Sequence, residues 1–206
     1  VLTLMTSPAA EGLFHRAIAQ SPPIAMIHSR AQSTLWAREL VHRLALPRRT
    51  SVEDLRQENF ADLVRSGQSM MWRAGELIHL NSCYAPTVDE ELIPEHPIAA
   101  FENGHQHQVP LLIGTNSDEA SFGKFLFQRQ SSRERAALRL LASFDPQHAP
   151  EVVAAYDGAV AREDFAHLLA DALFWAPSTR IAAAHAQVAP TWMYLSLIHI
   201  SEPTRQ

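Results

Sequence analysis

An acidic pair that follows a short apolar run is the feature of this sequence best suited to chemistry. The run is Val109–Gly114, and Asn116-Ser117-Asp118-Glu119 comes directly after Thr115. A strand that is apolar on both faces is typical of a parallel sheet covered by helices, and sites in such sheets are built at the carboxyl edge. A carboxylate there could orient a catalytic histidine and stabilise its imidazolium form. The competing interpretation is a capping box, with Asn116 as N-cap and Glu119 at the third position of a helix that begins at Ser117.

Two further groups of residues could bind a metal ion or act as a nucleophile. His105 and His107 flank Gln106, but no third ligand lies nearby in the sequence, so a solvated loop is the better interpretation. The other histidines are scattered and lie in no recognisable base motif. Cys83 is the only cysteine, which excludes an internal disulfide and a thiolate zinc site. The sequence therefore implies no metal and no cofactor, and a histidine-rich metal-binding module stays a weaker alternative.

Composition restricts the class of protein. The chain has 206 residues, of which 47% are hydrophobic and 19% charged, as in a globular chain with one domain. Its net charge of −5 argues against nucleic acid or an anionic membrane as the main partner. No apolar run reaches the ~18 residues of a transmembrane helix. A single cysteine favours a reducing compartment such as the cytoplasm.

Helical patterns alternate with short apolar runs, which predicts an α/β domain with a parallel sheet. Strands are predicted at His15–Gln20, Val109–Gly114 and Thr191–Tyr194. Helices are predicted around Trp36–Leu44, after Ser51 and after Asn59, and over Pro94–Gly104, Arg133–Phe144, Pro150–Tyr156, Glu163–Trp175 and Ser178–Gln187. The inner face of the Glu163–Trp175 helix is predicted to consist of Phe165, Leu168, Leu169, Ala172 and Leu173. The four tryptophans fit apolar stripes and are predicted to fill the core: Trp36, Trp72, Trp175 and Trp192.

The two ends of the sequence differ from its middle. Val1–Thr6 is an apolar run without an N-cap, which predicts part of a helix with residues missing upstream. Leu195–Arg205 resembles a translated sequencing-library adapter. Residues 195–206 are therefore interpreted as a non-native read-through tail, with a genuine terminal strand as the alternative. On this interpretation residues 1–194 form the domain.

Several blocks of the chain resemble the type-B carboxylesterases, which include para-nitrobenzyl esterases and cholinesterases. Ser7–Ser21 resembles the segment that follows the nucleophile elbow in that family. Four later blocks resemble family blocks in the same order: Tyr84–Asp89, Leu92–Pro94, Val109–Glu119 and Ala189–Tyr194. The resemblance implies a partial α/β-hydrolase fold. It would contain the C-terminal-side strands of the parallel sheet with flanking helices, and would lack the strand of the nucleophile elbow.

The resemblance also implies an activity. The family hydrolyses small-molecule carboxylic esters with a Ser-His-acid triad, and Asn116-Ser117-Asp118-Glu119 matches its acid motif, so Glu119 is the implied catalytic acid. No Gly-x-Ser-x-Gly turn occurs in these 206 residues. The family's serine would lie before Val1 and its histidine after Tyr194. A chain with one triad member of three is expected to be inactive alone. A non-catalytic, cholinesterase-like binding or adhesion module is the alternative.

The resemblance also implies that three residues belong to the substrate pocket. Phe122 resembles an aromatic position that lines the gorge of cholinesterases, and Leu80 and Ser82 fall where cholinesterases have acyl-pocket aromatics. The smaller side chains at the last two positions would leave room for a bulkier acyl group. Three residues depart from the family pattern, because each stands where the family commonly has glycine: Ala120, Glu90 and Pro22. A glycine that needs a positive φ would force a different local turn when replaced.

Overall fold

The computed structural model describes residues 1–71, 83–121, 123–126, 129–142 and 144–197. Within them lies a parallel three-stranded sheet in the order β1-β2-β3, made of β1 (Ala17–Gln20), β2 (Leu111–Asn116) and β3 (Thr191–Ser196). All three predicted strands are confirmed. The last extends through Leu195 and Ser196, the first two residues of the segment interpreted as a read-through tail. Residues 198–206 of that segment lie outside the described residues.

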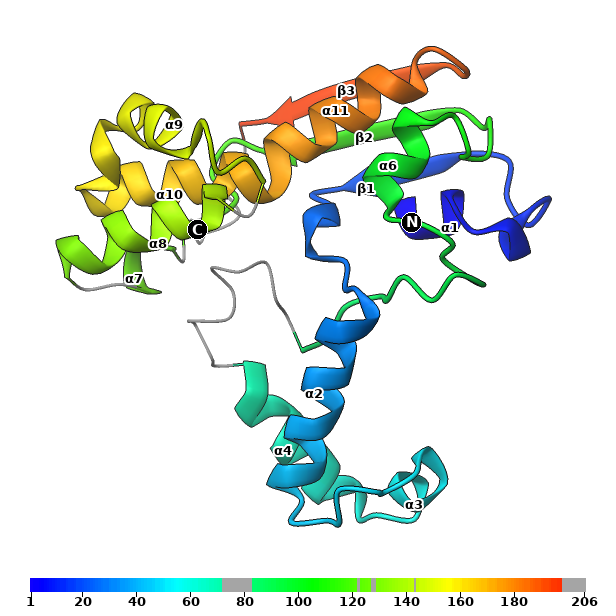
Figure 1. Cartoon of the computed structure of the whole chain (residues 1–206). Coiled ribbons are helices and arrows are strands. Elements are labelled where there is room, and N and C mark those ends of the chain that lie inside the picture. The colour runs from blue at the N-terminus through cyan, green and yellow to red at the C-terminus, as the bar shows by residue number, and fades with distance from the viewer. Residues whose placement is uncertain (72–82, 122, 127–128, 143, 198–206) are drawn as a thin grey trace, which may run out of the picture.

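Most of the helices occupy the connections between strands (Figure 1). Before β1 lie α1 (Leu2–Met5) and the 3-10 turn η1 (Pro8–Ala10). Between β1 and β2 lie η2 (Ile24–Met26), α2 (Arg30–Arg43), α3 (Val52–Arg56), α4 (Phe60–Met71) and α6 (Pro97–Glu102). Between β2 and β3 lie α7 (Gly123–Leu126), α8 (Gln130–Ala142), α9 (Ala149–Ala155), η3 (Asp157–Ala159), α10 (Arg162–Ala170), the π-helix η4 (Asp171–Trp175) and α11 (Ala176–His185).

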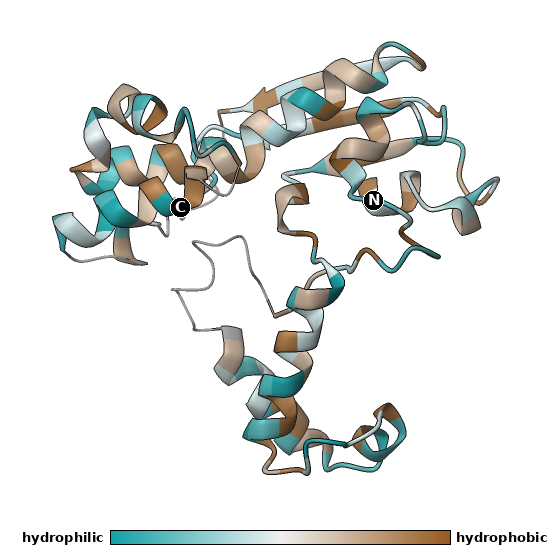
Figure 2. Cartoon of the chain, in the orientation of Figure 1, coloured by the Kyte–Doolittle hydropathy of each residue, from teal (hydrophilic) through white to brown (hydrophobic). Residues whose placement is uncertain are grey.

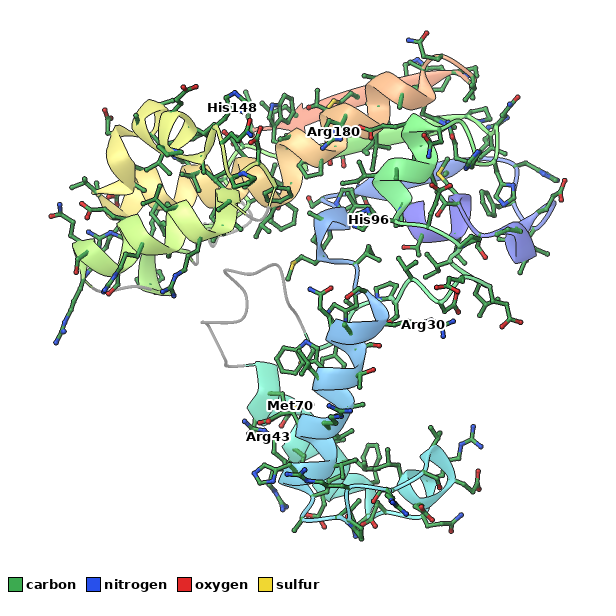
Figure 3. All side chains as sticks on the ribbon, viewed as in Figure 1. Arg30, Arg43, Met70, His96, His148 and Arg180 are labelled. Atoms are coloured by element: carbon green, nitrogen blue, oxygen red, sulfur yellow. The ribbon has the colours of Figure 1, made fainter. Side chains whose placement is uncertain are left out.

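One face of the sheet packs against helices. Alternate strand residues point to it, and Ala19, Leu111 and Ile113 are buried there with Phe101 of α6 and Ile181 of α11. Figure 2 shows hydrophobic residues along the strands. The helices α6 and α11 are also joined at the surface, where Arg180 Nε donates to Glu102 Oε1 at 3.0 Å, and Figure 3 shows Arg180 on α11 beside α6. This packing fixes the sheet from one side.

The opposite face of the sheet is open among the described residues. Ile18 and Trp192, which both pair with Leu112 in the register, are 58% and 57% exposed. The prediction that Trp192 fills the core is therefore wrong, because its side chain alternates onto this face. Trp175, at 37% exposure, is likewise not a core residue. Trp36 is buried as predicted, and Trp72 lies outside the described residues.

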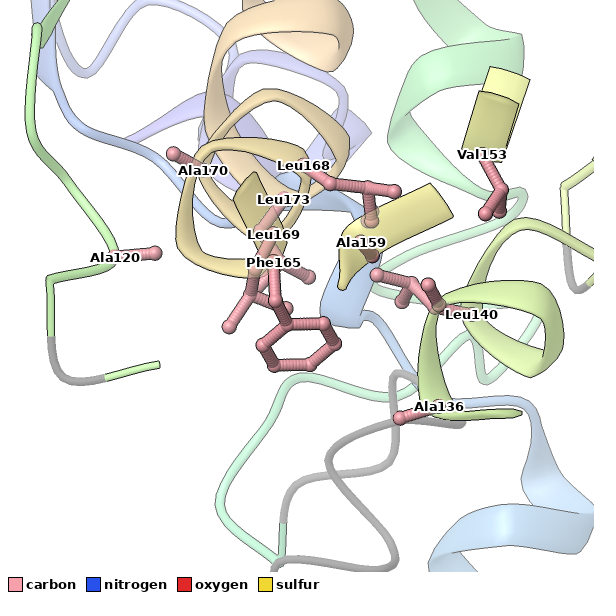
Figure 4. Close-up of a cluster of buried hydrophobic side chains, with 12 residues drawn as sticks. Ala120, Ala136, Leu140, Val153, Ala159, Phe165, Leu168, Leu169, Ala170 and Leu173 are labelled. Atoms are coloured by element: carbon pink, nitrogen blue, oxygen red, sulfur yellow. The ribbon is translucent and has the colours of Figure 1, made fainter. Parts of the chain in front are cut away.

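A second core lies among the helices between β2 and β3 (Figure 4). Phe165, Leu168, Leu169 and Leu173 are buried in it, and Ala172 is partly buried beside them, so the predicted inner face is confirmed. The predicted single helix over Glu163–Trp175 is wrong in one respect, since its last five residues form the π-helix η4.

The helices α2, α3 and α4 form an arm that lies away from the sheet (Figure 1). Ser29 begins α2 with a capping box to Gln32, and Ser51 begins α3 with a capping box to Asp54. The second of these starts was predicted. Arg43 Nη1 donates to Ser69 Oγ at 2.6 Å and so joins α2 to α4; Figure 3 shows Arg43 close to Met70 of α4.

Candidate active site

The Glu119 carboxylate lies in the turn directly after β2, at the carboxyl edge of the sheet. Its Oε1 atom accepts two hydrogen bonds, one from the backbone N–H of Asn116 at 2.6 Å and one from Ser21 Oγ. Among the described residues no hydrogen bond reaches Oε2. Hydrogen bonds to a carboxylate are charge-assisted and orient it strongly. The carboxylate is therefore held through one oxygen, and the other oxygen is left for a further donor.

The capping-box interpretation of this segment is half right. Glu119 reaches back to the N–H of Asn116, as the third residue of a capping box does. No helix begins at Ser117, however, because residues 117–121 form turns and α7 begins at Gly123. Asn116 is the last residue of β2. The Ser117 N–H continues the ladder by donating to Ser196 O of β3 at 2.8 Å, so the sheet holds the N–H of the residue at which the helix was expected to begin.

Sequence reasoning missed Ser21 as part of this site. Ser21 directly follows β1, and its N–H donates to Gly114 O at 2.8 Å. Its φ is +49°, a left-handed backbone that non-glycine residues rarely adopt. Such strain persists where the surroundings enforce it, and it is common at functional sites. The sequence could have indicated Ser21 only through its position directly after a predicted strand, because the carboxyl ends of neighbouring parallel strands meet at one edge of a sheet.

The three predicted substrate-pocket residues, Leu80, Ser82 and Phe122, lie outside the described residues. All three departures from the family pattern lie in the described residues, and Pro22 O there accepts the N–H of Ile24 at 2.8 Å. Glu90 has a φ of +67°, so the turn keeps a left-handed residue even though glycine is replaced. Ala120 is buried in the second core.

The histidines near β2 serve as structural groups. His105 Nδ1 contacts Glu95 Oε1, and this hydrogen bond holds the pKa of Glu95 below its usual range. His107 Nε2 donates to Ser7 O at 2.8 Å. His185 is buried, with Nε2 donating to Val109 O at 2.8 Å and Nδ1 facing Gln106 Nε2 at 3.3 Å. His105 and His107 thus have separate protein partners instead of sharing a ligand.

A hollow of about 470 Å³ lies between α2, α4 and residues 83–87. It is lined mainly by apolar side chains, among them Trp36, Leu63 and Met70, and by neither Glu119 nor Ser21. Cys83 also lines it, and burial raises the pKa of its thiol. A thiol that keeps its proton is a poor nucleophile, so the surroundings of Cys83 do not favour a nucleophilic role for it.

Neither a metal site nor a membrane span is found in the part of the chain that the structure describes. No group of three or more His, Cys, Asp or Glu side chains there could hold a metal ion. No helix there is both long and apolar enough to cross a bilayer. The chemistry of the site is that of one oriented carboxylate, which can hold and stabilise an imidazolium ion.

Comparison with known proteins gives one consistent result. Residues 1–201 match the model of the carboxylesterase family. The chain is 30% identical over 207 residues to the para-nitrobenzyl esterase of Bacillus subtilis (strain 168), covering 98% of this chain and 40% of that protein. It is 29% identical over 200 residues to the phenmedipham hydrolase of Pseudarthrobacter oxydans, covering 94% of this chain and 39% of that protein.

Solved structures agree with these sequence matches. A PNB esterase structure superposes on 98% of this chain and 41% of its own, with a TM-score of 0.77 and 27% sequence identity. A carboxylesterase of Geobacillus stearothermophilus shares the fold, with a TM-score of 0.74 at 22% identity. The partial α/β-hydrolase fold is therefore confirmed. The chain spans about two fifths of the length of the relatives it matches.

Proposed function

The chain belongs to the carboxylesterase family, and we propose that it supplies the acid of a Ser-His-Glu triad in a serine carboxylic-ester hydrolase. Glu119 is that acid. The nucleophilic serine and the histidine belong to parts of the whole protein outside these residues, where the whole protein means the natural protein that contains residues 1–194 of this chain. Its substrate class is small-molecule esters, in line with the para-nitrobenzyl esterase and the phenmedipham hydrolase to which it is similar.

The observation that carries the proposal is the way Glu119 is held. Asn116 N–H and Ser21 Oγ both bind Oε1, which fixes the carboxylate at the sheet edge where α/β proteins build their sites. An acid that serves only as a helix cap needs no donor from another strand. The contact with Ser21 joins the turn after β2 to the end of β1, so the carboxylate is oriented by two strands at once.

In the whole protein the reaction would proceed through an acyl-enzyme. The histidine would take the proton of the serine hydroxyl as the serine attacks the ester carbonyl, and would return it to the leaving alcohol. Glu119 would accept a hydrogen bond from the other imidazole N–H, set its tautomer and stabilise the imidazolium charge. Water would then hydrolyse the acyl-serine by the same route. The chain alone lacks the triad serine and histidine, so its turnover of esters should be lower than that of the whole protein by a factor on the order of a million.

Covalent labelling with a fluorophosphonate tests this proposal. The reagent should label the whole protein at one serine outside the present 206 residues and should leave the purified 206-residue chain unlabelled. Peptide mass spectrometry would locate the labelled serine. Absence of labelling in the whole protein, or labelling of a serine within this chain, would overturn the proposal. An unlabelled whole protein would instead favour the non-catalytic, cholinesterase-like binding module.

A further inference from the structure

Gly114 lies inside β2, where glycine has no evident conformational reason to occur. Its φ is not among the positive values found at Gly12, Gly104 and Gly158, so its backbone would accept a side chain. Glycine in a strand also weakens it by roughly 0.5–1 kcal/mol relative to alanine. A glycine kept in an ordinary strand conformation often marks a close approach by another group.

The group that approaches is the ring of Tyr194 on β3. Gly114 and Tyr194 are paired in the register of β2 and β3. A Cβ atom added at Gly114 would lie 2.3 Å from both Cδ1 and Cε1 of Tyr194 and 2.5 Å from Cγ. Because Cγ is the first ring atom, rotation of the ring about its own axis cannot relieve this overlap. A side chain at position 114 would have to displace the whole ring.

Gly114 is also connected to the candidate active site. Its carbonyl oxygen accepts the N–H of Ser21 at 2.8 Å, and Ser21 Oγ donates to Glu119. Two residues further along β2, the Asn116 N–H donates to the same carboxylate oxygen at 2.6 Å. The ring of Tyr194 therefore rests on the strand residue whose carbonyl holds Ser21 and which lies two residues before Asn116 on the same strand.

We propose that Tyr194 is a positioning residue: its ring packs on Gly114 and clamps the carboxyl edge of the sheet, which keeps Ser21 and Asn116 in place around Glu119. Gly114 is required because only glycine leaves room for the ring. The importance of this clamp for ester hydrolysis rests on the proposed function. The clamp itself does not, since it concerns only the hydrogen bonds at the sheet edge.

Amide hydrogen exchange, resolved to single residues in the whole protein, tests the clamp. The reporters are the amides of Ser21, Asn116 and Ser117 at the carboxyl edge, and the references are Ala17 and Leu111 at the amino edge, bonded to Pro110 O and Pro190 O. Y194A and G114A should each speed exchange at the reporters by about tenfold or more while the references stay unchanged. Y194F, which keeps the ring, should leave all five amides unchanged.

Two further variants sharpen the test. G114A/Y194A should be no faster at the reporters than either single variant, because both changes break one contact. G67A is the matched steric control: its Cβ would lie 1.9 Å from the hydroxyl oxygen and 3.2 Å from Cζ of Tyr84, the far end of a side chain that can swing aside without disturbing the sheet. Reporters that do not respond to G114A and Y194A, five amides that accelerate together, or effects that add in the double variant would each overturn the clamp.

Kinetics in the whole protein separate the clamp from the proposed function. With an aryl acetate as substrate, G114A should lower kcat by about tenfold with little change in KM, because it disturbs the orientation of the acid and not substrate binding. If the whole protein hydrolyses no ester, the proposed function fails while the exchange pattern still decides the clamp. If G114A leaves kcat unchanged in an active enzyme, the clamp has no positioning role and that part of the inference is wrong.

Discussion

Ser21 and Glu119 are 98 residues apart in the sequence, yet one hydrogen bond joins them. Glu119 was implied by its motif, since Asn116-Ser117-Asp118-Glu119 resembles the family's acid block. Ser21 could not be recognised in the same way, because its role arises from the pairing of β1 with β2 and from a left-handed backbone that sequence patterns do not reveal. At the scale of residues, motifs identify the group that performs chemistry, and strand pairing identifies the group that holds it.

Tyr156 offers a pH-dependent test at this scale. Burial, together with its hydrogen bond to Asp171, raises the pKa of Tyr156 above its ordinary value near 10. The native state thus holds this proton more tightly than the unfolded chain. The resulting stabilisation is complete below about pH 10 and is lost as the pH rises further. Y156F should lower the free energy of unfolding by about 1.5 kcal/mol at neutral pH, and by less at high pH.

Urea unfolding of the whole protein and of Y156F, at neutral pH and near pH 11, measures this difference. D171N is the companion variant: without the carboxylate the pKa of Tyr156 should fall, which ultraviolet absorbance of the phenolate would report. A difference in unfolding free energy between Y156F and the unmodified protein that stays constant over this pH range would contradict the assignment.

At the scale of elements, side chains that cap a helix correctly predicted where two helices begin. Ser51 with Asp54 predicted the start of α3, and Asn59 accepts the N–H of Ala61 at the start of α4. The same kind of signal failed at Asn116, because pairing of Ser117 with Ser196 of β3 competes with the start of a helix. The π-helix η4 lies between α10 and α11, and its residue types carry no signal that distinguishes it from an α-helix.

The end of α6 allows a clean test of backbone strain. Gly104 follows the C-cap Asn103 with a φ of +77°, and nothing lies within 4 Å of a Cβ placed there. G104A should therefore destabilise the protein by about 1 kcal/mol through its backbone alone. G104N should cost less, because asparagine tolerates the left-handed region. Thermal unfolding of both variants gives the comparison, and equal melting temperatures for G104A and the unmodified protein would contradict it.

At the scale of the whole molecule, the alternation of helices and apolar runs predicted the α/β class and all three strands. It did not predict which face of the sheet is open. Ile18 and Trp192 belong to apolar runs just as Ile113 does, and only the placement of α6 and α11 on one face distinguishes them. Parallel sheets are normally covered on both faces, whereas among the described residues this sheet is covered on one.

The open face predicts self-association of the purified 206-residue chain. Burial of one large apolar side chain contributes about 1.5–3 kcal/mol, so contacts through Ile18 and Trp192 should drive association as concentration rises. I18T/W192T should weaken it by about tenfold or more. Sedimentation velocity over a range of concentrations measures the effect. E91Q, at an exposed position outside the strands, is the control. A chain that stays monomeric at every concentration, or a double variant that associates as strongly as the unmodified chain, would show that this face does not mediate self-association.

The turnover number of E119Q in the whole protein tests the central claim most directly. Glutamine keeps the shape of the side chain but removes the charge that stabilises an imidazolium ion, so kcat for an aryl acetate should fall by about 10⁴-fold. E91Q, which removes one negative charge from an exposed position, should retain the unmodified kcat. An E119Q protein that folds and turns over ester as fast as E91Q would show that Glu119 is not the acid of the triad.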